Sequence, residues 1–239
     1  MFGRRWLEMT WRDGLLIHWP VEPGIVADTL PERLSVATYE GDAYLGVVPF
    51  LMTDIRPRGS PIGRSFPELN LRTYVDGPNG RGVYFYNLDA SDPVGVTVAR
   101  RLFALPYYRA RMRVDRDRNG ICFASDRTHR GVPSAAFDAT YEPVGEAFTP
   151  EPGSREAFLL ENYRFYAAGR RLYCGEIAHE PWTLRPATVD VRTNTLFEAA
   201  GLQPPSADPV LQYSPGFEMN VGSFDVQRVD DRAVSDTFA

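Results

Sequence analysis

The chain contains no lysine, although it has 26 basic residues, all of them arginine. A Schiff base between an enzyme and its substrate needs a lysine amine, and arginine cannot replace it because its guanidinium stays protonated. The sequence therefore excludes mechanisms that pass through a lysine imine. The exclusive use of arginine has two interpretations, a genome that favours arginine codons or a structural demand for arginine, and we favour the first.

The sequence also has few cysteines, no long apolar run and no excess of positive charge. The two cysteines, Cys122 and Cys174, are too few for a disulfide-stapled secreted scaffold. No run approaches the roughly 18 apolar residues of a membrane-spanning helix, and charged residues interrupt the N-terminal segment where a signal peptide would be apolar. The formal net charge of −5 argues against nonspecific nucleic-acid binding. We expect a cytoplasmic protein with no membrane or nucleic-acid partner, and leave open whether it forms homo-oligomers.

Twenty prolines and twenty glycines interrupt the sequence, and short β-branched and aromatic segments lie between them. This pattern predicts a β-rich α+β protein with strands separated by turns. An Asn119-Gly120 pair between two of these segments is a strong hairpin signal. The expected strands cover 38–52 after an initial turn, 69–75, 82–88, 108–116, 121–125, 135–143, 172–178 and 217–226.

Three helices are expected between these strands. Asp92 caps the first, Pro93 is its first residue, and it stops near Pro106. The second runs from 154 to 169, and the third from 194 to 201. The segment 143–154 is the best internal boundary, but strand patterns on both sides favour a loop within one domain that spans 1–239. A polar tail, 229–239, is expected to fray.

The segment 66–75 carries the most functional information. Because side chains alternate along a strand, one face presents Glu68, Asn70, Arg72 and Tyr74, and the other presents apolar residues. The polar face looks either at bulk water or at a wet cavity. We favour the cavity, because every position on this face carries a large hydrogen-bonding group.

Other polar residues are weaker candidates. Where a helix meets a strand, Pro106 is followed by Tyr107, Tyr108 and Arg109. Either these residues line the mouth of a pocket, or one tyrosine lies in the core and Arg109 is solvated. His18 is either packed or at a cavity rim. Neither the histidines nor the cysteines have the spacing of a metal site, so no metal and no cofactor is expected.

Several segments in a fixed order carry a resemblance to a known family. They are Trp19-Pro20-Val21 after His18, then 45–50, 66–75, 83–90, 105–108, 163–166 and His179-Glu180-Pro181-Trp182. Together they resemble the YqjF-like family of uncharacterised proteins over about 5–226. That family is similar to the acetoacetate decarboxylase-like superfamily.

The resemblance implies an antiparallel β-barrel or cone with a central cavity and a few peripheral helices. It also implies a correspondence with the decarboxylases, which use a proline followed by two lysines. Pro106 is similar to that proline, and the lysine positions fall on Tyr107 and Tyr108, neither of which can form an imine. Glu68 resembles a carboxylate of the decarboxylase cavity. The resemblance thus implies the barrel with its central cavity and one carboxylate, Glu68, but not Schiff-base decarboxylation.

Three functional classes remain. In the first, the protein binds an unknown small molecule, with Arg72 holding an anionic or carbonyl group. In the second, it is a lysine-independent enzyme of enolisation, hydration or dehydration type, and Glu68 is its general acid and base. The third is a purely structural or interaction protein. A raised pKa of Glu68 in a cleft would favour the second class, and a sealed apolar interior the third.

Overall fold

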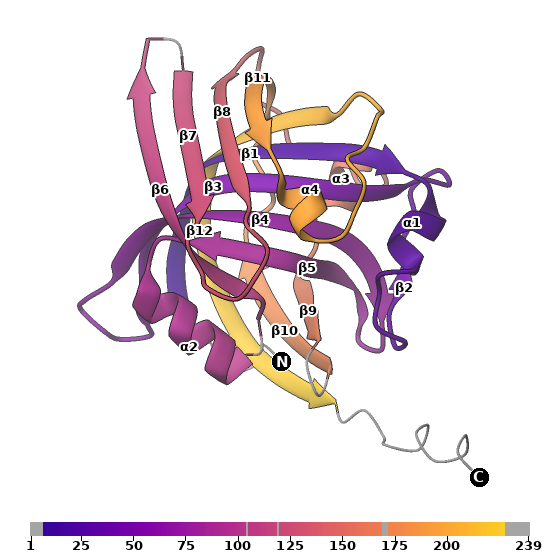
Figure 1. Cartoon of the computed structure of the whole chain (residues 1–239), viewed down its shortest axis with the longest axis horizontal. Helices are drawn as coiled ribbons and strands as arrows, with labels where there is room; N and C mark the ends of the chain where they lie inside the picture. The colour runs from indigo at the N-terminus through magenta and orange to yellow at the C-terminus, as the bar shows by residue number, and fades with distance from the viewer. Residues whose placement is uncertain (1–6, 104, 119, 169–171, 228–239) are drawn as a thin grey trace.

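The computed structural model describes residues 7–103, 105–118, 120–168 and 172–227, and strands dominate this part of the chain (Figure 1). The predicted tail 229–239 lies outside these residues. The elements are β1 (Leu7–Val21), α1 (Pro23–Ala27), β2 (Ser35–Val36), β3 (Ala43–Pro57), β4 (Arg64–Gly77), β5 (Gly80–Ala90), α2 (Pro93–Phe103), β6 (Tyr107–Asp117), β7 (Gly120–Arg127), β8 (Ala136–Pro143), α3 (Arg155–Leu160), β9 (Arg164–Ala168), β10 (Leu172–His179), β11 (Arg185–Asn194), α4 (Leu196–Ala199) and β12 (Val210–Gln227).

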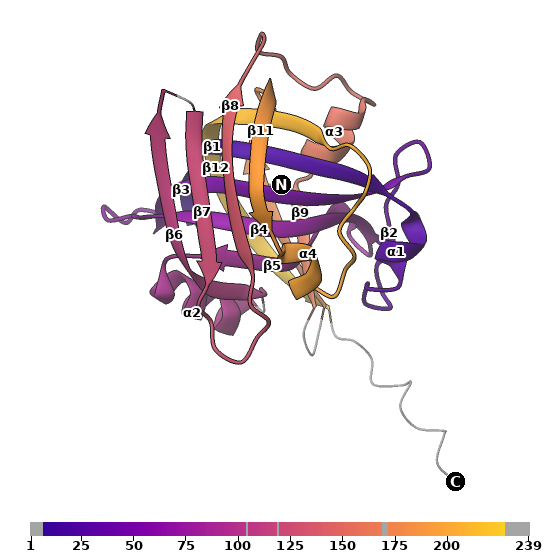
Figure 2. The same ribbon diagram turned by 45° about the horizontal axis from the view of Figure 1, so that its top comes forward.

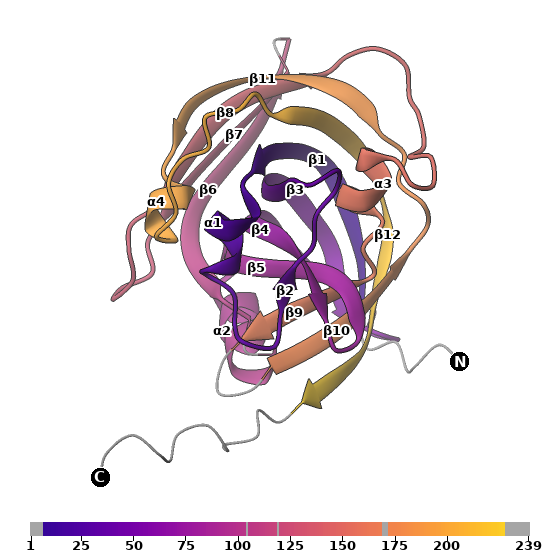
Figure 3. The ribbon, with the colours of Figure 1, turned by 90° about the vertical axis from the view of Figure 1, so that its right-hand side faces the viewer.

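The strands form one sheet that closes on itself twice. A nine-stranded barrel runs β5-β6-β7-β8-β11-β12-β1-β3-β4 and back to β5. A second, seven-stranded circuit runs β5-β9-β10-β12-β1-β3-β4, because β10 pairs with β12 and β5 with β4. Strands β12, β1, β3, β4 and β5 belong to both, while β6, β7, β8 and β11 lie on one side of them and β9 and β10 on the other (Figure 3). The predicted antiparallel barrel is confirmed, with parallel pairing only where β5 meets β6 and β9 among the described strands.

The five shared strands separate two interiors. Because side chains alternate along a strand, successive residues of these strands point into different interiors. Leu69 and Leu71 of β4 pack in an apolar cluster with Phe123 and Phe137, inside the nine-stranded barrel. Tyr74 of the same strand packs in the other cluster, inside the seven-stranded circuit. Both faces of β4 are therefore buried over Glu68–Val75, which rules out the solvent-facing interpretation of Glu68, Asn70, Arg72 and Tyr74.

Two helices lie at opposite ends of the seven-stranded circuit. Helix α2 lies at the lower left of Figure 1 and α3 at the upper right, behind the strands. The two helices again lie on opposite sides of the molecule in the rotated view of Figure 2. Phe158, Leu159 and Leu160 of α3 are buried in the cluster of this interior. Asp92 accepts a hydrogen bond from Val94 N at 3.1 Å, so it caps α2 as predicted. No helix in the described residues is both long and apolar enough to span a membrane.

The second predicted helix was too long. Helix α3 begins after Ser154, whose side chain caps it, but it ends at Leu160, and Arg164–Ala168 forms strand β9 instead. Pairing of β9 with both β5 and β10 overrides the helical propensity of this segment. The predictions also missed β1 and β11 entirely, and α4 begins at Leu196 rather than directly after Asn194. The predicted internal boundary 143–154 does not interrupt the sheet, because β9, which follows it, pairs with β5, which precedes it. That the whole chain forms a single domain stays a prediction.

A candidate ligand-binding cavity

A cavity of about 390 Å³ lies inside the seven-stranded circuit. Strand β4 contributes to the wall every second residue from its start to Arg72, namely Arg64, Phe66, Glu68, Asn70 and Arg72. The face that the sequence marked as polar therefore looks into an enclosed space. Because Glu68–Val75 is buried on both faces, Glu68, Asn70 and Arg72 are shielded from bulk water, whereas Arg64 at the start of the strand is exposed.

The rest of the wall is mainly apolar. Helix α2 contributes Val94 and Val98 at one end, and α3 contributes Leu159 and Leu160 at the other. The barrel wall between them includes Met9, Trp11, Phe50, Met52, Val83, Phe85, Phe165, Ile177, Phe217 and Met219. Few polar groups on an apolar wall are typical of a site that orients a small organic ligand.

Glu68 and Tyr107 form the acidic group of the cavity. The Tyr107 hydroxyl donates a hydrogen bond to Glu68 Oε2 at 2.8 Å. Burial raises the pKa of Glu68 to about 8; the hydrogen bonds from Tyr107 and Asn70 oppose the rise, and the charge of Asp89 adds to it. At neutral pH this side chain is therefore mostly a carboxylic acid, able both to donate and to accept a hydrogen bond.

Arg72 lies further along β4, beside a buried aromatic pair. Its guanidinium carbon is 5.9 Å from the ring centre of Tyr74, and the Tyr74 hydroxyl is 2.7 Å from His18 Nε2. Burial, together with the charge of Arg72, holds the pKa of His18 well below its ordinary value, so His18 is neutral. Gly46 lies between His18 and Arg72 in the register of β1, β3 and β4. A Cβ there would approach His18 Cδ2 to 2.8 Å, so only glycine fits.

The charge of Arg72 has no counterion in the part of the chain that the structure describes. Among the described residues, no carboxylate lies within 4.0 Å of its guanidinium, and its Nε has no hydrogen-bond partner. The side chain is only 7% exposed. Asn70 Oδ1, Asn162 Oδ1 and His18 Nδ1 in the same interior are also buried without a partner in the described structure. Such atoms are rare in folded proteins, so their concentration here indicates a place for polar ligand atoms or water.

An ion pair that the sequence did not predict lies at the α2 end. Arg64 donates from Nε and Nη2 to the two carboxylate oxygens of Asp92, at 2.6 Å each. These hydrogen bonds hold the pKa of Asp92 below its ordinary value, although burial opposes the shift. The side chain of Arg64 is 55% exposed, so this end of the cavity faces solvent.

Tyr108 and Arg109 do not join the other predicted residues. Tyr108 lies on the opposite face of β6, where the guanidinium of Arg127 stacks 4.4 Å from its ring. Arg127 in turn forms a buried bidentate ion pair with Asp89 at 2.8 Å. Arg109 is exposed, in a separate small pocket with His129. Of the eight predicted residues, Glu68, Asn70, Arg72 and Tyr107 line the cavity, and His18 and Tyr74 adjoin Arg72.

A model of a family described as an uncharacterized conserved protein, DUF2071, matches residues 8–218. The chain belongs to the DUF2071 family. It is also 39% identical over 212 residues to the uncharacterized protein YqjF of Bacillus subtilis strain 168, covering 87% of each chain. The resemblance stated from the ordered segments is thereby confirmed.

Two solved structures share the fold of this DUF2071 protein at low sequence identity. One is the enduracididine biosynthesis enzyme MppR complexed with pyruvate, with a TM-score of 0.65, 11% identity, and coverage of 95% of this chain and 91% of that one. The other is an acetoacetate decarboxylase-like enzyme from Sphingomonas wittichii RW1, with a TM-score of 0.63, 12% identity and 94% coverage of both chains. The acetoacetate decarboxylase-like fold is thus confirmed, in a chain without lysine.

Several residues of the DUF2071 cavity were not predicted as site residues. His179 lines it, with Nδ1 2.7 Å from Glu180 O and its ring stacked 4.7 Å from that of Tyr163. Trp182 and Asn162 line it as well. The His179–Trp182 segment was among those that carried the family resemblance. That resemblance was the one signal in the sequence that could have pointed to His179 and Trp182 as cavity residues. Within the described residues, no group of three or more His, Cys, Asp or Glu side chains is arranged to hold a metal ion.

Proposed function

We propose that this DUF2071 protein binds a small organic molecule that carries a carboxylate, with the Arg72 guanidinium as the anion-binding group. The observation that carries the proposal is the buried charge of Arg72, which lines an apolar cavity and has no carboxylate within 4.0 Å in the described structure. Glu68 and Asn70 on the same face would orient the rest of the ligand.

The energetics favour an anion over a neutral ligand. A buried charge without a counterion costs several kcal/mol in folding free energy, and arginine cannot lose its proton to avoid that cost. A ligand carboxylate would offset much of it by accepting two hydrogen bonds from the guanidinium. The mostly protonated Glu68 adds no negative charge that would repel such a ligand.

The neighbouring fold is compatible with this ligand class. MppR is similar in fold, and its structure was solved in complex with pyruvate, which has both a carboxylate and a carbonyl group. At 11% identity this similarity shows only that the two proteins share a fold. The chemistry is therefore argued from Arg72, Glu68 and Asn70 of this chain.

A comparison of charged and neutral ligands of matched shape tests the proposal. Calorimetry with carboxylic acids and their primary amides should show that the wild type prefers the acid by at least about tenfold, since charge-assisted hydrogen bonds contribute about 1.5–3 kcal/mol. Arg72→Met and Arg72→Gln should both lose this preference.

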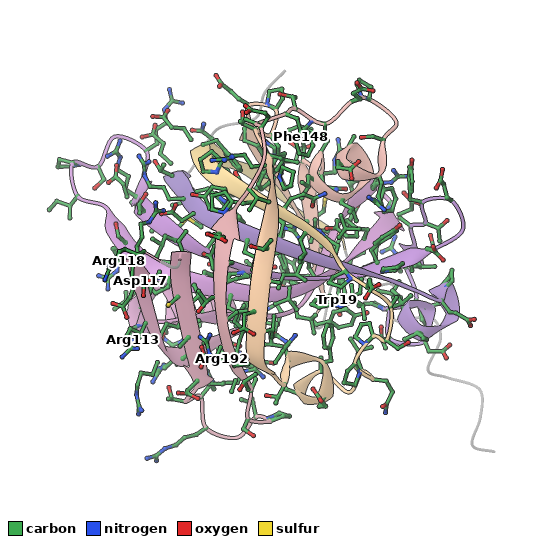
Figure 4. The ribbon with its side chains drawn as sticks, turned by 90° about the horizontal axis from the view of Figure 1, so that it is seen from above. Trp19, Arg113, Asp117, Arg118, Phe148 and Arg192 are labelled. Atoms are coloured by element: carbon green, nitrogen blue, oxygen red, sulfur yellow. The ribbon has the colours of Figure 1, made fainter. Side chains whose placement is uncertain are left out.

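Arg113→Met is the matched control. It also removes one positive charge, but Arg113 lies on the outer face of β6, away from the cavity, with its side chain 80% exposed (Figure 4). It should keep the preference of the wild type for the acid. An acid preference that survives in both Arg72 variants, or the absence of binding by any acid, would overturn the proposal.

The hydrogen-bonded pair Glu68–Tyr107 favours a second candidate function, acid–base catalysis. With a pKa of about 8, Glu68 exists in both protonation states near neutral pH, as a general acid and base must. In an enolisation, its carboxylate would remove a proton from the carbon next to a ligand carbonyl. The electron pair of that C–H bond would form the enolate, and Glu68 would return the proton.

Exchange of ligand hydrogen for deuterium separates catalysis from binding. If Glu68 is a base, NMR should detect exchange next to the carbonyl of a bound oxo acid. The rate should rise with pH, reach half of its maximum at about pH 8, where half of Glu68 is ionised, and level off above that pH. Glu68→Gln should abolish exchange and retain binding. No exchange above the rate in buffer would leave only the binding function.

A further inference from the structure

The residues of β4 that line the cavity extend from Arg64 to Arg72, so its polar groups follow one another along the strand. The Cα atoms from Arg64 to Arg72 span about 26 Å at the usual rise of a strand. The Arg64–Asp92 ion pair marks the solvent-facing end. Phe66, the Glu68–Tyr107 pair and Asn70 follow, and Arg72 comes last.

Arg72 lies at the closed end. Residues of α3 block the way beyond it, with Phe158 buried 5.6 Å from Tyr74 between ring centres. The hydrogen-bonded residues Tyr74 and His18 also lie beside Arg72 at this end, and both are fully buried. An anion that reaches Arg72 must therefore enter from the α2 end with its carboxylate leading.

Two polar groups of the cavity are too far apart to bind adjacent atoms of one ligand. The Cα atoms of Glu68 and Arg72 are about 13 Å apart along the strand. The side chain of Arg72 leans away from Glu68, toward the Tyr74 ring and His18. The carboxyl of Glu68 instead contacts Tyr107 and Asn70.

We propose that the ligand is an elongated, slender carboxylic acid with a hydroxyl or carbonyl oxygen well separated from its carboxylate. This inference rests on the proposed function, since it assumes that Arg72 holds the carboxylate. The chain of the acid lies along β4, and its second oxygen meets Glu68 and Tyr107. The tail lies against Phe66, Met52 and Val94 near the open end.

Chain length and oxygen position can be varied independently to test this inference. The first probes are straight-chain acids from butanoate to decanoate, with their primary amides. For the wild type we expect affinity to rise about fourfold per added methylene until the cavity is full, as each buried methylene contributes about 0.8 kcal/mol. The second probes are oxooctanoates with the carbonyl at positions 2 to 7. Their affinity should peak at position 4 or beyond.

Variants assign each part of the ligand to a residue. Glu68→Gln and Tyr107→Phe should flatten the peak among the oxooctanoates by at least about fivefold, while the preference for acid over amide survives. Both variants keep the shape of the side chain, and Arg113→Met again serves as the control for charge and folding.

The outcomes distinguish the two proposals. If short and long acids bind equally well, or the best carbonyl position is 2, the elongated ligand is wrong while the carboxylate site on Arg72 stands. A peak that is unchanged in both Glu68→Gln and Tyr107→Phe also refutes the assignment of the second oxygen. If acids of every length bind no better than their amides, the proposed function itself fails.

Discussion

Replacing Glu68 by glutamine tests the electrostatics of the cavity with little change in its shape. Glutamine has nearly the volume of glutamate, and its carbonyl oxygen can still accept the hydrogen bond that Tyr107 donates at 2.8 Å. It cannot ionise. The pH dependence of the difference in stability between the two proteins therefore measures the cost of a negative charge at this position.

The expected size follows from the raised pKa of Glu68, about 8 instead of 4.5. Between these values the folded chain retains a proton that the unfolded chain releases, so the free energy of unfolding of the wild type falls as pH rises. The contribution of Glu68 falls by at most about 1.4 kcal/mol per pH unit, and by about 3 kcal/mol between about pH 5 and pH 8. Below about pH 4 the acid is neutral in both states, and this contribution is constant.

Urea unfolding of both proteins at a series of pH values measures this difference. Other groups, including Asp89, titrate in both proteins, so their contributions largely cancel when the two free energies are subtracted. Glu68→Gln should gain stability relative to the wild type as pH rises from about 5 to 8. A difference that stays constant within about 0.5 kcal/mol would show that Glu68 is solvated or paired with a cation, and it would refute the electrostatic argument.

Further predictions concern three other buried positions. Gly46→Ala should lower the free energy of unfolding by about 1–3 kcal/mol, since its Cβ would lie 2.8 Å from His18 Cδ2; an unchanged urea midpoint would contradict this packing. Arg72→Met should leave the ligand-free protein at least as stable as the wild type by the same assay, and a loss of about 3–5 kcal/mol would reveal a buried ion pair instead. Asp89→Asn should cost about 3–5 kcal/mol, because Arg127 stays buried without its counterion, and a loss below about 1 kcal/mol would show that Arg127 finds another partner.

Alternation on a strand gave the most reliable information in the sequence. The period of two placed Glu68, Asn70 and Arg72 on one face and Leu69 and Leu71 on the other, and the structure separates them in the same way. The same rule could have separated Tyr107 from Tyr108, since neighbours on a strand face opposite sides. They were grouped because both follow Pro106 where a helix meets a strand, but Tyr108 lies against Arg127.

Long-range pairing set the features that the sequence did not reveal. Segment 164–168 reads as part of a helix, yet it forms β9 because β5 and β10 provide hydrogen-bonding partners on both sides. The double closure of the sheet depends on pairings such as β10 with β12, which no local pattern encodes. The cavity residues His179 and Asn162 became neighbours of β4 residues only through this closure.

The double closure also explains why polar residues in the middle of β4 indicate a function. A strand that is shared by two interiors has no solvent face, so each polar side chain on it must find a partner inside or lower the stability of the fold. Glu68 avoids most of this cost by staying protonated and by accepting a hydrogen bond from Tyr107. Arg72 has neither option, because its guanidinium cannot become neutral and no carboxylate of the described chain lies beside it. The proposed selectivity for anions therefore rests on Arg72, and in that proposal Glu68 would distinguish ligands at neutral pH by hydrogen bonding.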